Sequence, residues 1–297
     1  MTVVTRVPIK FQIGARTVFS VPRQLLRLPL SLDDALTGAV PALPPLGGAD
    51  GYQVTSLPED LLPALTASGR IVFVRQRYTR FHADLTTGFD AWWAGLSGNT
   101  RSGLKRKAKR IGASEVRRYR TPDELAAFHG IARGIAEKTY QERLLGSGLP
   151  DSPAFVADML EQAAAGTVRA WLLFVEGAPV AYLYCPIRAG NVIYEYVGHD
   201  PAAADLSPGA VLQLEAMRDL FAEDGLRHFD FTEGEGQHKR SMASGGIACV
   251  DLLLLRPTLT NRAVVTALAG FDRSVALAKA GFARVGLEGW GRKLRRG

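Results

Sequence analysis

The chain has 297 residues, of which 47% are hydrophobic and 22% are charged, the composition of an ordinary globular protein. Its length allows one large domain or two of moderate size. No uninterrupted apolar run reaches about 18 residues, and the N-terminal residues lack a signal peptide's apolar core. We therefore expect a cytoplasmic protein without a membrane-spanning helix. Cys185 and Cys249 lie in apolar runs, which favours buried thiols over a disulfide framework.

The net charge of +7 is concentrated in two short segments. Residues 101–120 contain nine lysines or arginines against one acid, Glu115, and a second cluster, RKLRR, lies at 292–296. Such patches attract nucleic acid, lipid headgroups, phosphorylated cofactors or acidic carrier proteins. Charge does not choose among these partners. Peripheral membrane contact through the basic C-terminal tail is one of the open alternatives.

The N-terminal part of the chain is predicted to be rich in β-structure. Two β-prone runs flank Gly14-Ala15, the pattern of a hairpin. The Pro- and Gly-rich stretch 40–51 predicts a loop or linker, and residues 70–85 predict one or two strands. The segment TTGFDAWWAGLS then predicts a short helix with Trp92 and Trp93 in the core.

Helices are predicted over the next segments. Residues 98–111 combine an apolar stripe at helical spacing with a strongly basic face. The TPDE segment at 121–124 is a helix-start signature, with a Thr cap, a Pro in the first turn and a Glu three residues after the cap. A further helix is expected to begin near Ser152 and to end at Gly166.

Three β-rich runs follow, at 168–175, 179–188 and 191–199, with turn residues between them, which predicts an antiparallel meander. A loop of small residues leads into a helix that starts at Ser207-Pro208-Gly209 and runs to about residue 224. A fourth strand is expected at 227–231. A helix-like GEGQHKRSMAS, a strand IACVDLLLLRP and a helix over 259–285 come after it.

The order of three antiparallel strands, a loop, a helix and a parallel fourth strand resembles the acyl-CoA site of GNAT acyltransferases. The motifs VIYEYVGHDP, LSPGAVLQLEAM, HFDFTEG and HK, within roughly residues 100–245, resemble one GNAT branch in particular. That branch contains FemABX-like aminoacyltransferases and the acetyltransferases found with cellulose and exopolysaccharide genes. The sequence departs from it at His199, where the branch tends to have Tyr, and at His238 before Lys239, where Tyr-Lys is usual.

The resemblance implies an α/β (α+β) fold with a mixed, mostly antiparallel sheet flanked by helices. It implies a GNAT-like catalytic domain over 98–258, after a β-rich N-terminal half at 1–97 and before a C-terminal helix and basic tail at 259–297. FemABX-like chains often carry two GNAT-like units. The N-terminal half is therefore a candidate for a degenerate GNAT-like partner.

The helix start at 207–210 is the candidate phosphate-binding site. The first N–H groups of a helix have no partners within the helix and carry the positive end of its dipole. Gly209 permits close approach of an anion, and Ser207 can cap the helix or donate to phosphate. The same start also occurs in helices that bind nothing. The resemblance makes acetyl-CoA or another acyl-CoA the donor, and the residues expected around it are Val197, Leu206, Ser207, Pro208, Gly209 and Ala210.

The resemblance also implies how the acyl group is transferred. A backbone N–H near Val197 is expected to polarise the thioester carbonyl. The amine acceptor must lose a proton, so a carboxylate or imidazole is needed nearby. Glu195 is the first candidate base, and His199 and Asp230 follow it. Each has a structural alternative, because Glu195 can be solvated or salt-bridged and His199 can be a polar strand end.

The other candidate residues concern the acceptor. Asp230 lies between two phenylalanines and needs a partner, which we expect to be Lys239 or Arg240. Lys239 can instead hold an acceptor carboxylate or a cofactor phosphate, and the basic helix can bind a polyanion or be a solvated face. The residues expected near the acceptor are Tyr194, His238, Lys239, Arg101 and Lys105. The histidines and cysteines have no zinc-site spacing, so no metal is expected.

Three functions remain open at this point. The first is an N-acyltransferase that moves an acyl group from acyl-CoA to an amine of a small molecule, peptide or sugar, by direct attack. The second keeps the fold but uses acyl carrier protein or aminoacyl-tRNA as donor. The third is a non-enzymatic module for nucleic acid or a membrane surface, although the basic run lacks interleaved aromatics and DNA-binding motifs.

Overall fold

The computed structural model describes residues 4–14, 16–66, 69–139, 148–234 and 236–284. The chain forms two compact units. We call Thr79–Ile247 the central unit, and Met1–Tyr78 with Ala248–Gly297 the terminal unit. Strands β4 (Ile71–Asp84) and β11 (Gly245–Leu255) continue from one unit into the other. The boundaries of these units differ from those of the domains expected from the sequence, which are 1–97, 98–258 and 259–297. The expected domain boundaries stay a prediction.

The terminal unit is built on the β-hairpin that the sequence predicts. Strands β1 (Val4–Ile13) and β2 (Arg16–Pro29) pair antiparallel, β2 pairs parallel with β3 (Gly51–Pro58), and β3 pairs antiparallel with β11. The helical elements of this unit are α1 (Leu32–Thr37), η1 (Glu59–Leu61), α2 (Leu62–Thr66) and α10 (Leu259–Arg284). Residues 39–50 contain no helix or strand, as expected for the Pro- and Gly-rich stretch.

A buried polar cluster forms where the pairing of β3 with β11 is interrupted. Thr55 and Ser56 lie opposite the single residue Asp251, which is a β-bulge. Ser56 has a φ of 59°, and its N–H donates to Asp251 Oδ1 at 2.8 Å. The Tyr78 hydroxyl donates to the same oxygen at 3.1 Å, and its burial raises the pKa of Tyr78. The carboxylate thus satisfies the backbone group that the bulge leaves unpaired.

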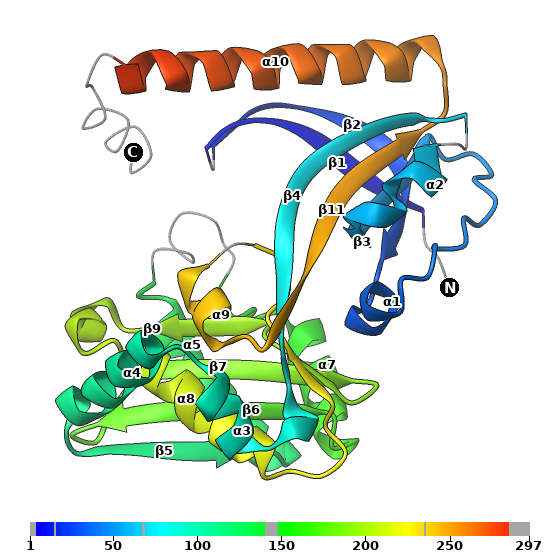
Figure 1. The fold of residues 1–297 in the computed structure, drawn as a ribbon. Coiled ribbons are helices and arrows are strands. Elements are labelled where there is room, and N and C mark those ends of the chain that lie inside the picture. Colours follow the sequence, from blue (N-terminus) through cyan, green and yellow to red (C-terminus); the bar gives the residue numbers. More distant parts are fainter. Residues whose placement is uncertain (1–3, 15, 67–68, 140–147, 235, 285–297) are drawn as a thin grey trace. The chain divides into compact units, whose positions relative to one another are not determined.

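The central unit is a mixed sheet in the strand order β4-β10-β8-β7-β6-β5, with β9 paired to β7 (Figure 1). Its strands after β4 are β5 (Ser114–Tyr119), β6 (Val168–Val175), β7 (Ala178–Arg188), β8 (Asn191–Ile193), β9 (Tyr196–His199) and β10 (His228–Asp230). The predicted meander is confirmed. Both of its turns have two residues at positive φ, Glu176-Gly177 and Ala189-Gly190, as tight hairpin turns require.

Helices cover both faces of this sheet. The side chains of β7 point alternately to the two faces, and each set packs in the core under one group of helices. Leu183 and Cys185 point into a core with α3 (Phe89–Gly95), α4 (Gly98–Ile111) and α8 (Pro208–Phe221). Tyr182 and Tyr184 point into a core with α5 (Pro122–Ala136) and α7 (Pro153–Ala164). The short elements η2 (Leu85–Thr87), η3 (Pro201–Leu206) and α9 (Gln237–Met242) complete the unit. The α+β fold with a mixed, mostly antiparallel sheet is confirmed.

Local sequence signals are matched by local structure in this unit. The Thr121 side chain accepts from the Glu124 N–H while the Glu124 carboxylate accepts from the Thr121 N–H, which is the expected capping box. Trp92 is buried in the core, and both cysteines are buried thiols that are not joined in a disulfide. Among the helices that the structure describes, none combines the length and the hydropathy that crossing a lipid bilayer requires.

Several expected elements differ in extent. Residues 70–85 form one strand, the helix expected to reach 224 ends at Phe221, and the fourth strand is only three residues long. The small-residue loop before α8 is a 3-10 helix, because Asp200 accepts from the Ala202 N–H and Pro201 favours a helical first turn. The strand expected over 191–199 is interrupted at Tyr194-Glu195. The basic tail at 292–296 lies outside the described residues.

Candidate functional site

Two neighbouring strands part at the centre of the sheet. Strand β8 runs parallel to β10 as far as the pair Ile193 and Asp230, and the Tyr194 N–H donates to the Asp230 carbonyl at 2.9 Å. Beyond that point β9 pairs with β7. The residues Ile193–Glu195 lie opposite only Cys185 and Pro186 of β7. This is a β-bulge whose partner strand contains a proline without an N–H group, and bulges bend a strand away from its neighbour.

The backbone of β9 presents N–H groups on the side away from β7. The Asp200 N–H donates to the Val180 carbonyl at 2.8 Å, and antiparallel pairing alternates from residue to residue. Gly198 therefore points its N–H at β7, whereas Val197 points its N–H away. A Cβ atom on Gly198 would lie 2.5 Å from the Tyr182 ring, so this close approach requires glycine.

The start of α8 is the second component of the site. Ser207 adopts a left-handed conformation with a φ of 54°, and its side chain accepts no hydrogen bond from the first turn. Of the two roles expected for Ser207, capping is therefore wrong. A Cβ atom on Gly209 would meet no atom within 4 Å. The first turn thus offers the Gly209 N–H, the Ser207 hydroxyl and open space beside them.

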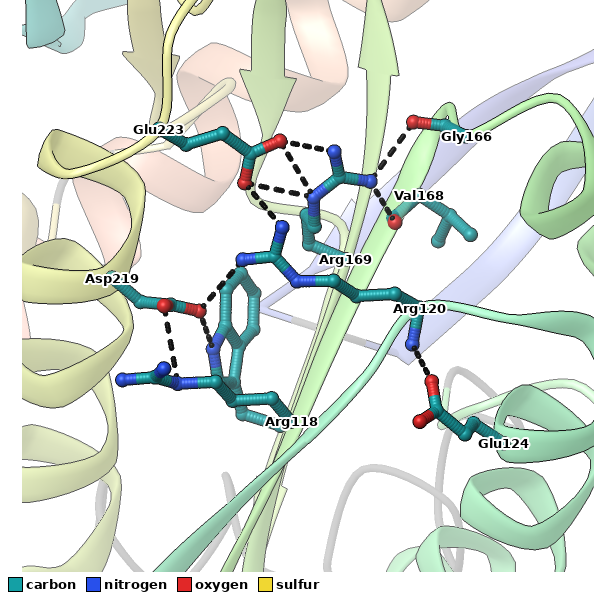
Figure 2. A network of polar contacts seen from close by, with 9 residues as sticks. Arg118, Arg120, Glu124, Gly166, Val168, Arg169, Asp219 and Glu223 are labelled. Carbon is teal, nitrogen blue, oxygen red and sulfur yellow. Dashed lines mark hydrogen bonds and ion pairs between the residues drawn. The ribbon is translucent and has the colours of Figure 1, made fainter.

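The other end of α8 is held to the sheet by buried carboxylates (Figure 2). Asp219, which is 7% exposed, accepts from Trp171 Nε1 at 3.0 Å. Arg118 Nε lies 3.1 Å from Asp219 Oδ1, and Arg120 Nη2 lies 3.2 Å from Asp219 Oδ2. One helix residue thus binds three donors from β5, β6 and the segment after β5.

Glu223, one turn later, extends this network. Arg120 Nη1 lies 2.8 Å from Glu223 Oε2, and Arg169 Nε donates to both oxygens at 3.0 Å. Partial burial raises the pKa of Glu223, but Arg169 and Arg120 lower it by more, so the net shift is downward. The backbone N–H of Arg120 donates to Glu124 at 2.8 Å, which links the network to the start of α5. The network thereby fixes the position of α8 and of its first turn.

Glu195 lies in the bulge itself. Its backbone N–H bonds to the Cys185 sulfur, whose burial raises the pKa of that thiol. The Glu195 side chain reaches solvent, yet the surrounding protein atoms raise the pKa of its carboxyl group. Asp158 raises this pKa further, and Arg188 opposes the shift. A carboxylate with a raised pKa is a better proton acceptor than an ordinary surface glutamate.

The other two candidate bases have different surroundings. His199 is exposed at the end of β9, beside Asp200, which pairs with Lys138 at 2.7 Å. Asp230 is fully buried, and both of its oxygens accept from Arg80, Oδ1 from Nε at 3.2 Å and Oδ2 from Nη2 at 2.5 Å. The expectation that Lys239 or Arg240 is its direct partner is wrong, because Arg80 on β4 fills that position. Lys239 donates to the Glu233 carbonyl instead.

Tyr194 and His238 are brought together beside the end of β10, with ring centroids 6.0 Å apart. Tyr194 also contacts Phe229 and Phe231, and burial raises the pKa of its hydroxyl. Partial burial lowers the pKa of Lys239, against the opposing charges of Asp230 and Glu233. Three of the residues expected near the acceptor thus lie on neighbouring segments next to the parted strands.

The basic helix α4 packs against α8 and η3. Leu104 and Ile111 are buried, as the stripe predicts. Arg101 donates to the Ala94 carbonyl at 2.9 Å, and Lys105 is exposed. Within the described part of the chain, no group of three or more His, Cys, Asp or Glu side chains could hold a metal ion.

Sequence reasoning missed the partners of the buried carboxylates. Arg80 stands 150 positions before Asp230, and no local pattern connects them. Asp219 and Glu223 did carry a signal. They are two acids four positions apart, Asp219 in the last turn of the largely buried helix α8 and Glu223 two residues after its end. Two such acids need cationic partners when they are buried. Arg118 on β5, Arg120 just after β5 and Arg169 on β6 supply them.

Comparison with known proteins places these features in a family context. Residues 98–240 match the family described as the GNAT acetyltransferase domain. Among curated proteins, no match to the sequence is found. The fold is similar to that of FemX, with a TM-score of 0.55 and 11% identity over 88% of this chain and 90% of that one.

Two further solved structures share the fold. One is the C-terminal DUF2156 domain of a putative lysylphosphatidylglycerol synthetase from Agrobacterium fabrum, with a TM-score of 0.52 and 11% identity over 75% of this chain and 73% of that one. The other is a conserved protein of unknown function from Bacteroides thetaiotaomicron, with a TM-score of 0.51 and 15% identity over 69% and 70%. Likeness at this level of identity concerns the fold alone.

The anchoring of α8 generates a stability prediction. Asp219→Asn keeps the size of the side chain but removes the charge that three donors share. We expect it to lower the free energy of unfolding by about 2 kcal/mol, less than for a fully buried pair because Arg118 is largely exposed. Urea unfolding monitored by circular dichroism measures the loss. Asp224→Asn, at an exposed site just past α8, is the control and should stay within about 0.5 kcal/mol. Equal effects of the two variants would contradict the anchoring role.

Proposed function

We propose that residues 98–240, which match the GNAT acetyltransferase domain, move an acyl group from an acyl-CoA thioester to an amine acceptor. The observation that carries the proposal is the parting of β9 from β10 beside a helix start without a side-chain cap. The N–H groups that β9 turns away from β7 suit an extended thioester arm. The helix start suits the pyrophosphate at the other end of that arm.

The donor's phosphates would be bound by the first turn of α8. The Gly209 N–H and the Ser207 hydroxyl are its free donor groups, and the helix dipole adds positive potential. Leu206, Pro208 and Ala210 would line the approach, with the open space beside Gly209 leaving room for an anion. The first turn of α8 has one glycine, so its backbone can make few contacts with the phosphates. Because the contacts are few, the position of α8 must be well fixed for them to form.

The acyl transfer step follows from the groups along β9. The amine nitrogen attacks the thioester carbonyl carbon, and the negative charge that develops on the carbonyl oxygen is stabilised by the Val197 N–H. Glu195 accepts the proton that the amine loses. The carbon–sulfur bond then breaks, and the CoA thiolate leaves and takes up a proton from solvent. No covalent enzyme intermediate is needed.

The candidate bases are not equally suited to this step. Glu195 lies two residues before Val197, reaches solvent and has a raised pKa. His199 is exposed and can serve in its place. Asp230 accepts hydrogen bonds from Arg80 and from the Thr232 N–H at 2.9 Å, so a structural role suits it better. Tyr194, His238 and Lys239 are the proposed contacts of the acceptor, an amine of a small molecule, peptide or sugar.

A second donor class is favoured by one observation. The cations of α4, among them the half-buried Arg101 and the exposed Lys105, stand on a helix that packs against η3 and α8. A polyanionic donor, either acyl carrier protein or aminoacyl-tRNA, would find them beside the proposed phosphate site. The FemABX-like resemblance of the sequence agrees with this alternative. The match to an acetyltransferase domain favours an enzyme over a module that only binds nucleic acid or a membrane surface.

The phosphate site is tested by Gly209→Glu. The new carboxylate would occupy the open space beside the first turn and repel a pyrophosphate, so we expect the Kd for CoA to rise at least tenfold in isothermal titration calorimetry. Gly130→Glu is the control, because Gly130 is an exposed helical glycine of the same unit with similar free space. Failure of the wild-type protein to bind CoA, or unchanged binding by Gly209→Glu, would contradict the proposal.

The role of Glu195 is tested by a pH profile. A general base works only when unprotonated, so kcat/KM should rise with pH through the pKa of Glu195, which lies above the ordinary value of 4.5. Glu195→Gln should lose this acid limb and about 10²–10⁴-fold of the rate, while any limb that belongs to the amine remains. Glu176→Gln, in an exposed turn, should behave as wild type. An acid limb that survives in Glu195→Gln would assign the base elsewhere.

The donor class is tested by neutralising α4. With acyl-CoA as donor, the triple variant Arg101→Gln, Lys105→Gln and Lys109→Gln should change the KM for acyl-CoA less than threefold. With a carrier protein or tRNA as donor, the same variant should lose most of the rate, and wild-type activity should fall steeply as salt is raised. Initial rates with each donor at two salt concentrations separate the two outcomes.

A further inference from the structure

The tip of the β1–β2 hairpin carries large apolar side chains that stay more than half exposed among the described residues of its unit. Ile13 is 53% exposed, Val18 58% and Phe19 57%. Val18 is the extra residue of a β-bulge, because Phe19 pairs with Phe11 and Thr17 with Gln12. Neighbouring apolar residues on both strands thus project at one end of the hairpin. A cluster of this kind on a hairpin tip is a contact surface rather than scattered surface residues.

These side chains continue the face of the hairpin that α10 covers. Val7, Ile9 and Phe11 are buried in a core with Leu268, and Phe271 makes an edge contact with Phe11 at 5.5 Å. The Phe19 ring centroid lies 5.4 Å from that of Phe11, with the rings tilted by 53°, but Phe19 stays open to solvent. After Phe271 the helix continues, and Leu277 is 74% exposed. The helix and the hairpin tip therefore both leave apolar side chains exposed just beyond their shared core. Figure 1 shows α10 running along the β1–β2 hairpin.

The charge around this apolar surface has a single sign. Strands β1 and β2 together carry five cations and no carboxylate between Val4 and Pro29. Lys10 and Arg16 are exposed near the tip. The one acid of α10, Asp272, lies 3.8 Å from Arg75 Nη1, so its charge is opposed within the unit. Arg273, the next residue, is exposed.

We propose that the hairpin tip (Ile13, Val18 and Phe19) with the adjoining turns of α10 is a docking surface for an anionic lipid bilayer. The apolar side chains enter the boundary between headgroups and acyl chains, while Lys10, Arg16 and Arg273 contact the headgroups. This combination of apolar insertion and basic contact is how peripheral proteins bind anionic membranes. The proposal concerns the terminal unit and does not depend on the donor or on the reaction.

Two other occupants fit the same surface less well. A second copy of the chain would bring the cations of one hairpin against the identical cations of the other, without carboxylates on these strands to pair with them. A nucleic acid would contact the cations but would leave Val18 and Ile13 without a partner, since phosphates offer no apolar surface. A bilayer satisfies both the charge and the apolar side chains.

The test is co-sedimentation of the full chain with vesicles. We expect binding to vesicles of phosphatidylglycerol and phosphatidylcholine at a ratio of about 1:3, and at least tenfold weaker partitioning onto pure phosphatidylcholine. Phe19→Ser should weaken binding about tenfold. Val40→Ser is its matched control, because Val40 is 50% exposed in the same unit but lies beside the end of β2 that is opposite to the hairpin tip, and it should bind as wild type.

The charge contribution is tested with the same vesicles. Lys10→Gln and Arg16→Gln should each weaken binding about fivefold, whereas Arg27→Gln, an exposed cation at the other end of β2, should have a smaller effect. Circular dichroism of each variant checks that the fold is kept. Absence of binding to anionic vesicles overturns the proposal. So does binding that Phe19→Ser leaves unchanged while single-stranded RNA competes it away, which would assign the surface to a polyanion.

Discussion

The one extra residue that Ile193–Glu195 place opposite Cys185 and Pro186 is the constraint on which the central unit depends. Without it, β8 and β9 would form one straight strand beside β10, and the sheet would close by ordinary pairing. With it, β9 keeps its bonds to β7 and leaves β10. The backbone N–H of Val197 is then turned toward the side that β10 has left. The bulge also carries Glu195, so one irregularity sets both the gap and the first candidate base.

The position of α8 depends on a different kind of interaction. A first turn without a side-chain cap adds little to the stability of a helix. The contacts that fix α8 in place are at its opposite end. Asp219 and Glu223 bind arginines of β5, β6 and the segment between β5 and α5, together with Trp171. Buried ion pairs add modest net stability because desolvation offsets much of their attraction. Their effect here is positional, since the charged contacts define where along the sheet α8 can lie.

The sequence predicts those parts of the fold that local chemistry determines. The capping box of α5 involves residues three apart, and the tight turns of the meander are marked by glycines at positive φ. The start of α8 at Pro208 was predicted for the same reason. The parallel pairing of β10 with β8 is predicted by the resemblance of the motifs to a known family and by no local signal in the sequence.

What could not be predicted depends on contacts between distant residues. Asp230 was correctly expected to need a partner, but Arg80 comes from a strand far earlier in the chain. The break in the strand at Tyr194-Glu195 arises from register against β7 rather than from any strand-breaking residue in its own sequence. The residue type of Ser207 allows it to cap the helix or to donate to phosphate, and its left-handed backbone leaves the side chain without a capping bond. Register and long-range charge pairing are set by tertiary packing, which a single sequence does not encode locally.

A crystal structure of the full chain with a non-hydrolysable acyl-CoA analogue tests the central claim most directly. Our account predicts the pyrophosphate within hydrogen-bonding distance of the Gly209 N–H, and the carbonyl of the analogue facing the Val197 N–H between β9 and β10. An analogue bound elsewhere on the chain, or a gap that stays empty at saturating concentration, would contradict it.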